Sequence, residues 1–248
     1  MSLRRAFWRR FRQFRRRVAG LPDTGRVDFG QLRRLEPFGR HFGEDRGLAL
    51  DRHYIEAFLQ AHQADIRGRV LEIGEDRYTR QFGGDRVTGS EILHVTPENP
   101  RATIVGDLAD APHIPDAAFD TLIVTQTLHL IYDAKAAART MHRVLRPGGV
   151  LLLTVPGITQ IPNGTPWAHT WYWAFTPLSV QRMIGEAFAG GTVRGSQYGN
   201  VLSAASMLYG LSAADLRQAL RETVPLSVTR AEDVAALRRW AAERARLA

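Results

Sequence analysis

The sequence predicts an α/β protein, a mostly parallel sheet with helices on both faces. Residues 70–74, Val-Leu-Glu-Ile-Gly, have the composition of a buried strand that ends in a carboxylate and a glycine. Short apolar runs and helical stretches alternate after it, as expected when crossover helices join parallel strands. Pro-Gly-Gly at 147–149 then ends the most regular helical stretch. Open sheets of this kind bind ligands where their strands end, so the residues after each strand are the candidate site.

The same patterns divide the 248 residues into one large domain, residues 51–230, and its appendages. Strands are expected near 69–73, 86–90, 102–105, 120–125, 149–155, 192–197 and 224–230. Helices are expected at 51–64, 135–145, 212–222 and 231–248. Residues 19–50 form a linker or lid, within which Phe42, Asp45 and Arg46 are candidate lid residues.

Two of these helices have clear sequence signals. The helix at 51–64 carries an apolar face that would cover one end of the sheet. That face comprises Tyr54, Ile55, Phe58 and Leu59. The C-terminal helix at 231–248 is opened by Thr229-x-x-Glu232, which resembles a capping box.

Residues 1–18 form a basic amphipathic arm. Its apolar residues recur at intervals of four, four, three and four, which places them on one face of a helix. They are Leu3, Phe7, Phe11, Phe14 and Val18. Such a helix suits an anionic membrane surface, with its apolar side chains at the headgroup boundary and its arginines beside the lipid phosphates. Packing on the domain or on a partner protein, and contact with RNA, are the alternatives.

Composition excludes several classes of function. With no cysteine, the chain forms no disulfide, thiolate metal site or cysteine nucleophile. No HExxH or paired-carboxylate motif is present, so no metal site is expected. The absence of GxxxxGK[ST] and GxSxG motifs argues against a nucleotide triphosphatase and an α/β-hydrolase.

The charge distribution indicates where the protein acts. The arm holds eight of the 33 basic residues and no acid, so the rest of the chain carries 25 basic and 25 acidic side chains. A balanced body does not suggest a nucleic-acid substrate. The arm has no apolar run long enough to span a bilayer or to act as a secretory signal. We therefore expect a cytoplasmic protein, attached through residues 1–18 to the inner face of a membrane.

Several segments resemble a known family. They are Val-Leu-Glu-Ile-Gly at 70–74, Gly-Asp-Leu at 106–108, the apolar run 119–124 and Leu-Arg-Pro-Gly-Gly at 145–149. Their order resembles the class I S-adenosylmethionine-dependent methyltransferases, type 11-like. This resemblance implies a Rossmann-like, seven-stranded, mostly parallel sheet, with S-adenosylmethionine as cofactor. Segments 113–120, 125–133 and 171–176 are similar to a bacterial branch associated with glycosyltransferases and with glycan or natural-product clusters.

The turn after the first strand departs from the family pattern. Most members of the superfamily have Gly-x-Gly-x-Gly there, whereas Gly74 is followed by Glu-Asp-Arg-Tyr at 75–78. Glycines let the backbone approach a ligand without a Cβ clash, so this turn must have a different shape. A non-catalytic scaffold with a degenerate cofactor site is therefore an alternative to an enzyme.

The resemblance also implies a set of cofactor-binding residues. Glu91, expected after the second strand, would accept the ribose hydroxyls; Asp107 would accept the adenine amino group, beside Leu108. Gln126 would face the methionine end. The full set is Glu72, Gly74, Glu91, Asp107, Leu108 and Gln126. A structural role in the turn is the alternative for Glu72, a solvated acid for Glu91, and a turn or cap residue for Asp107.

Two histidines are candidates for catalysis. A hydroxyl acceptor usually needs a base near neutral pH, and histidine has a suitable pKa. His129 follows the fourth strand, and His169 lies in an aromatic segment. For each histidine, the alternative is a hydrogen bond within a loop or a helix cap. An amine acceptor would need only positioning.

The same segments supply candidate substrate-binding residues. Tyr132, Trp167 and Trp171 would stack on a sugar face or another flat acceptor, unless they belong to the core. The sequence thus predicts O-methylation of a sugar, glycan precursor or glycosylated small molecule. N-methylation of an amino sugar or natural product is the alternative. Neither the acceptor nor the oligomeric state follows from the sequence.

Overall fold

The structure is a computed structural model that describes residues 30–162 and 169–222. The chain divides into two units, Met1–Pro37 and Phe38–Ala248, which we treat separately. In the first, the described residues include one short 3-10 helix, η1 (Gly30–Arg33). The predicted helices at 1–18 and 231–248 and the predicted strand at 224–230 lie outside the described residues.

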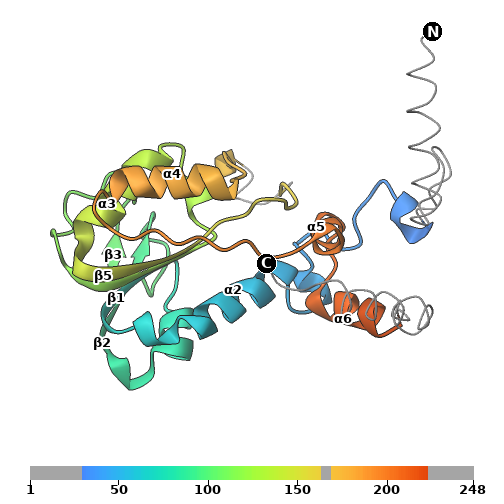
Figure 1. Cartoon of the computed structure of the whole chain (residues 1–248), viewed down its shortest axis with the longest axis horizontal. Helices are drawn as coiled ribbons and strands as arrows, with labels where there is room; N and C mark the ends of the chain where they lie inside the picture. Colours follow the sequence, from blue (N-terminus) through green and yellow to red (C-terminus); the bar gives the residue numbers. More distant parts are fainter. Residues whose placement is uncertain (1–29, 163–168, 223–248) are drawn as a thin grey trace, which may run out of the picture. The chain divides into compact units, whose positions relative to one another are not determined.

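The second unit is built on a parallel sheet (Figure 1). Its described strands are β1 (Gly68–Ile73), β2 (Val87–His94), β3 (Ile104–Val105), β4 (Phe119–Thr125) and β5 (Leu145–Thr154). They lie in the order β3-β2-β1-β4-β5, and every neighbouring pair is parallel. The strand order reverses between β1 and β4, the point at which open sheets bind ligands.

The predicted Rossmann-like sheet is confirmed, with five strands in the described residues where the sequence predicted seven. The strand expected at 192–197 does not form. That segment has no apolar face to bury, because all its residues except Val193 are exposed.

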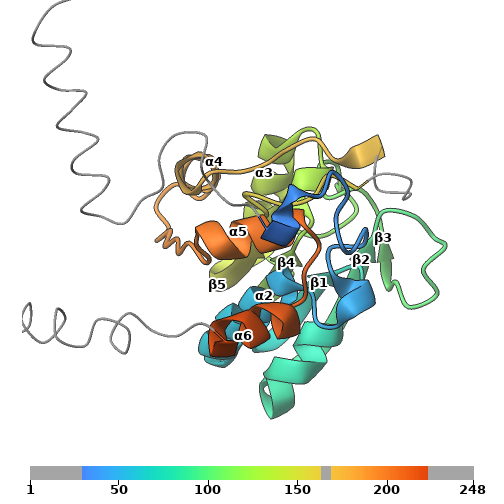
Figure 2. The same ribbon diagram turned by 90° about the vertical axis from the view of Figure 1, so that its right-hand side faces the viewer.

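Helices cover both faces of the sheet (Figures 1 and 2). The described α-helices of this unit are α2 (Leu50–Ala61), α3 (Ala134–Val144), α4 (Pro177–Ala187), α5 (Val201–Leu208) and α6 (Ala213–Glu222), of which α5 and α6 lie beside the sheet. Helices α3 and α4 lie on one face, and α2 lies on the other. The helices predicted at 51–64, 135–145 and 212–222 are confirmed, each ending or beginning within a few residues of its predicted bounds.

Helices α4 and α5 were missed, although each has a local signal. Thr176 and Ser179 exchange side-chain-to-backbone hydrogen bonds at the start of α4, and Asn200 and Ser203 do so at the start of α5. These are capping boxes in which serine replaces the usual glutamate or glutamine, so the common motif does not match them.

The sheet separates two hydrophobic cores. Against α3 and α4, the core includes Leu71, Leu93, Phe119 and Met141. On the other face, Ile55 and Leu59 of α2 pack against the sheet, with Phe58 beside them. Tyr54 packs in a third cluster, beside Leu50 and Met207. The predicted apolar face of α2 is therefore confirmed, although its residues pack in two different hydrophobic clusters. Within residues 30–162 and 169–222, no helix is both long and apolar enough to cross a membrane.

Candidate active site

Gly74 ends β1 in a conformation that favours glycine. Its φ is +84°, in the left-handed region, and its N–H donates to the carbonyl of Leu93 at 2.9 Å. A Cβ built at Gly74 would have no atom within 4 Å. The residue therefore presents open space at the end of the central strand, which a ligand can approach closely.

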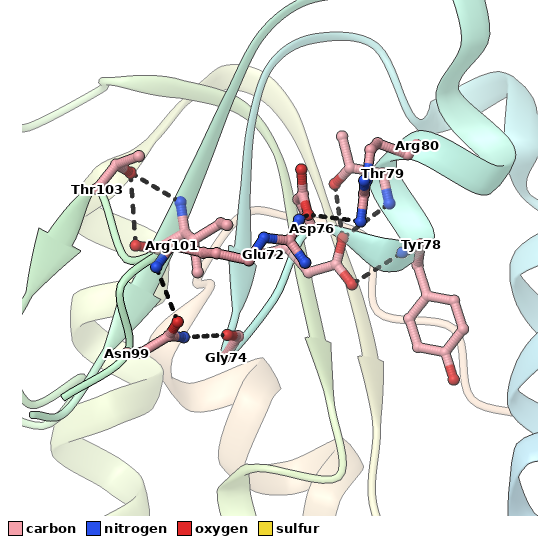
Figure 3. A network of polar contacts seen from close by, with 10 residues as sticks. Glu72, Gly74, Asp76, Tyr78, Thr79, Arg80, Asn99, Arg101 and Thr103 are labelled. Atoms are coloured by element: carbon pink, nitrogen blue, oxygen red, sulfur yellow. Dashed lines mark hydrogen bonds and ion pairs between the residues drawn. The ribbon is translucent and has the colours of Figure 1, made fainter.

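Glu72 holds the turn that follows. The side chain is 2% exposed and accepts hydrogen bonds from the backbone N–H groups of Tyr78 and Thr79 at 3.1 and 2.7 Å, and from the Thr79 hydroxyl at 2.7 Å (Figure 3). Burial raises the pKa of Glu72 to about 7, although the three donors oppose that rise. These contacts fix the start of the π-helix η4 (Thr79–Gly83), which is the structural role anticipated as an alternative.

The sequence placed Glu91 just after the second strand, and this prediction is wrong. Strand β2 continues to His94 because Ile92 and Leu93 are buried and extend the pairing with β1. Glu91 therefore lies three residues, or about 10 Å, before the strand end. A hydrogen bond from Thr103, together with an ion pair to Arg69 at 2.8 Å, lowers the pKa of its carboxylate. We therefore leave Glu91 out of the proposed ligand contacts.

Asp107 and Leu108 follow β3, as predicted, but only the Asp107 side chain is exposed to solvent. The Asp107 side chain is exposed, and its Oδ1 accepts a hydrogen bond from the backbone N–H of Ala109 at 2.8 Å. Leu108 is 4% exposed and belongs to the core beneath α3 and α4. Asp107 can thus accept hydrogen bonds from a ligand, whereas Leu108 would contribute mainly its backbone.

Gln126 leaves β4 with a φ of +47°, which is rare for a residue with a Cβ. Its N–H donates to the carbonyl of Thr154 at 3.0 Å, so the unusual conformation is anchored to β5. Because β4 neighbours β1, Gln126 and Gly74 lie at the ends of adjacent strands. Both unusual backbone conformations thus occur where the strand order reverses.

His129 lies beyond Gln126 in the short helix η6 (Leu128–Leu130) and is 2% exposed. Its Nδ1 is buried without a hydrogen-bond partner among the described residues. Burial lowers the pKa of His129 to about 4, so the imidazole is neutral at physiological pH. A neutral histidine with an unpaired buried nitrogen is able to hydrogen-bond a ligand or accept a proton.

Aromatic residues cover His129. The Trp171 ring lies 4.2 Å from the His129 ring, and Phe42 stacks on Trp171 at 5.8 Å. Phe42 comes from the segment predicted as a lid, and its N–H donates to Gln160 Oε1 at 3.1 Å. Trp171 packs against His129, and Phe42 packs on Trp171 in turn.

Other aromatic side chains form an exposed surface nearby in the chain. Tyr132, Tyr172 and Trp173 are 72%, 46% and 39% exposed, and Tyr132 contacts both of the others at 5.3 and 6.0 Å. We call these three residues the aromatic platform. The backbone N–H of Tyr172 donates to the His129 carbonyl at 2.9 Å, which joins the platform to the His129 segment. His169 is exposed, and Trp167 lies outside the described residues.

Two polar residues of the site were missed in the sequence. Asn99 and Arg101, between β2 and β3, contact the turn after β1 (Figure 3). Their only sequence signal was a position in a loop at the carboxyl edge of the sheet.

Part of the chain is similar to known methyltransferases. Residues 56–153 match the family model for a methyltransferase domain. A probable S-adenosylmethionine-dependent methyltransferase of Mycolicibacterium smegmatis is 33% identical over 102 residues, which are 40% of this chain and 35% of that protein. Residues 56–153 thus resemble an S-adenosylmethionine-dependent methyltransferase domain. This resemblance supports the predicted enzyme class and cofactor, whereas the branch stays a prediction.

Two further similar proteins match a larger part of this chain. The malonyl-[acyl-carrier protein] O-methyltransferase of Serratia marcescens is 29% identical over 200 residues, 73% of this chain and 78% of that protein. A solved S-adenosylmethionine-dependent methyltransferase of Archaeoglobus fulgidus has a TM-score of 0.44 and 11% identity, and the match covers 55% of this chain and 68% of that one. The chain spans only about a third of the Mycolicibacterium relative, 35% of its length.

The residues of the candidate site fit S-adenosylmethionine. Gly74 leaves open space, Gln126 has an anchored left-handed backbone, and Asp107 is an exposed acceptor, all at the ends of strands that lie in one sheet.

We expect replacement of Gly74 by alanine to weaken S-adenosylhomocysteine binding at least about tenfold, because the new Cβ would occupy the ligand's space. The positive φ should cost only about 1 kcal/mol of stability. Calorimetric titration and thermal unfolding would measure the two effects; equal binding by the variant would contradict this placement.

Proposed function

We propose that the protein transfers a methyl group from S-adenosylmethionine to a hydroxyl of a sugar, glycan precursor or glycosylated small molecule. The observation that carries this proposal is His129, a neutral, buried histidine with an unpaired Nδ1 just beyond β4. The cofactor, when bound, supplies an electrophilic methyl group on its sulfonium. His129 would accept the hydroxyl proton of the acceptor as its oxygen attacks that methyl group.

The aromatic platform supports a sugar-bearing acceptor. Tyr132, Tyr172 and Trp173 present ring faces and edges to solvent, and sugar rings pack well on such surfaces. Hydrogen bonds from Trp173 Nε1 to the carbonyls of Ile131 and Tyr132, at 3.0 and 3.2 Å, hold the indole in place. Trp171 would contact the acceptor closer to His129.

A second candidate function is N-methylation of an amino sugar or natural product. The low pKa of His129 favours it, because a base with a pKa of about 4 accepts protons less readily than ordinary histidine. An amine acceptor needs positioning more than a base. The Serratia relative supports O-methylation instead, because it is an O-methyltransferase and matches 73% of the chain.

The place of action is part of the proposal. We infer a cytoplasmic enzyme that meets its acceptor at the inner face of a membrane, through the basic arm of residues 1–18. The support is the arm's sequence, with arginines and one apolar face. Sedimentation with anionic vesicles, compared with neutral vesicles, tests this inference.

Titration with S-adenosylhomocysteine tests the function, with Asp107→Ala and Asp110→Ala as a matched pair. Both aspartates are exposed in one turn, but Asp107 directly follows Gly106 at the end of β3. We expect the wild type to bind, Asp107→Ala to bind at least about tenfold more weakly, and Asp110→Ala to bind like the wild type. If the wild type does not bind, a non-catalytic scaffold becomes the better explanation.

A further inference from the structure

The turn after β1 is held by a neighbouring loop. Residues 95–103 connect β2 to β3, and from this loop Asn99 Nδ2 donates to the carbonyl oxygen of Gly74 at 2.6 Å (Figure 3). Asn99 Oδ1 accepts the backbone N–H of Arg101 at 3.0 Å. The amide thus uses a donor at one end and an acceptor at the other, a combination that aspartate lacks.

A second contact joins the same loop to the turn. The Arg101 guanidinium pairs with the carboxylate of Asp76, two residues after Gly74. Arg80 also pairs with Asp76, at 3.2 Å, but it lies four residues along the same segment. Of these two arginines, only Arg101 links the loop to the turn, whereas Arg80 supports the turn from within.

The loop itself is fastened to β2. The backbone N–H of Thr103 donates to the Ile92 carbonyl at 3.0 Å, and the Thr103 hydroxyl accepts the N–H of Ile92 at 2.8 Å. Asn99 and Arg101 are therefore presented from an anchored segment.

These contacts matter because the turn has one glycine. Gly74 alone in residues 74–78 has a positive φ, and Glu75, Asp76 and Arg77 all carry side chains. Glycines in this turn usually allow the backbone to approach the ligand. With one glycine, the backbone of residues 74–76 can approach the ligand only if it is held in a single conformation. Glu72 holds the far end of the turn, at Tyr78 and Thr79, whereas Asn99 binds the Gly74 carbonyl, beside the hydrogen bond from the Gly74 N–H to β2.

We propose that Asn99 and Arg101 are positioning residues for S-adenosylmethionine, which fix the turn of residues 74–76 against the cofactor in place of the missing glycines. This inference rests on the proposed function. The two residues act through Gly74 and Asp76. Asn99 makes the stronger contribution, because the Arg101 side chain is 46% exposed and exposed ion pairs contribute little energy.

Three variants of the full chain test the proposal by calorimetry with S-adenosylhomocysteine and by thermal unfolding. Asn99→Asp removes the donor to Gly74 and should weaken binding about tenfold or more. Arg101→Gln should weaken it about threefold, and Arg101→Lys should restore most of the loss. Arg80→Gln is the matched control, since it removes the same charge from the same carboxylate without detaching the loop; we expect a change below about twofold.

The melting temperature separates positioning from general destabilisation. We expect the unliganded variants to melt within about 3 °C of the wild type, because the affected contacts are partly exposed. Equal losses of affinity in Arg101→Gln and Arg80→Gln would indicate a pure charge effect and overturn the proposal for Arg101. Wild-type affinity in Asn99→Asp would overturn it for Asn99. Both results leave the proposed function standing, whereas failure of the wild type to bind would overturn function and inference together.

Discussion

Replacement of Glu72 by alanine should abolish S-adenosylhomocysteine binding and lower the free energy of unfolding by about 2–4 kcal/mol. The substitution leaves the buried N–H groups of Tyr78 and Thr79 without their acceptor and opens a cavity beneath the turn. The turn and the start of η4 would then lose their fixed shape. Calorimetric titration and denaturant unfolding measure the two losses.

The control for Glu72 is Glu75→Ala, three residues away in the same turn and exposed to solvent. It should change neither binding nor stability by a measurable amount. The destabilisation by Glu72→Ala should also depend on pH. The folded-state pKa of Glu72 is raised above its unfolded value, so its contribution is full at low pH and declines as pH rises through about 7. A loss of stability that is larger at pH 8 than at pH 5 would contradict the buried, proton-binding state.

Much of the fold could be predicted from local patterns. Strand β1 was clear because its residues are buried in succession, and α3 was clear because Pro-Gly-Gly follows it. Strand β2 was predicted too short, since Glu91 looked like a strand end. In the structure, the burial of Ile92 and Leu93 extends the strand past Glu91, and Arg69 on β1 pairs with its carboxylate. A cross-strand partner of this kind cannot be seen in one segment of sequence.

The candidate site could be predicted only in part, for a similar reason. Gly74, Asp107 and Gln126 were identifiable because the family resemblance places cofactor contacts just after the strands that precede them. The cover over His129 depends on Phe42 and Trp171, which are far apart in the chain and meet only after folding. Similarly, Asn99 reaches Gly74 across a tertiary contact. Residues at strand ends follow from topology, whereas contacts between loops require the packed structure.

Substitution of His129 by glutamine should lower kcat for a hydroxyl acceptor about 100-fold or more, with S-adenosylhomocysteine affinity unchanged within about twofold. Glutamine fills a similar volume and keeps polar atoms near the Nδ1 position, but it accepts no proton near neutral pH. Because His129 is 2% exposed, this variant disturbs the packing against Trp171 less than alanine would. Initial rates and calorimetric titration measure the two quantities. His169→Gln, at an exposed histidine in the same aromatic segment, is the matched control.

The pH profile of the wild type supplies the second part of the His129 prediction. An ordinary histidine base would lose activity as pH falls through about 6.5. Burial lowers the pKa of His129 to about 4, so the rate should stay level from pH 8 to pH 6 and fall only towards pH 4. The same shift makes the free energy of unfolding decline as pH falls from about 6.5 to about 4. In that range His129 is protonated in the unfolded chain but not in the folded protein. An unchanged rate in His129→Gln would exclude this base and favour an amine acceptor, and inactivation by His169→Gln instead would transfer the role to that residue.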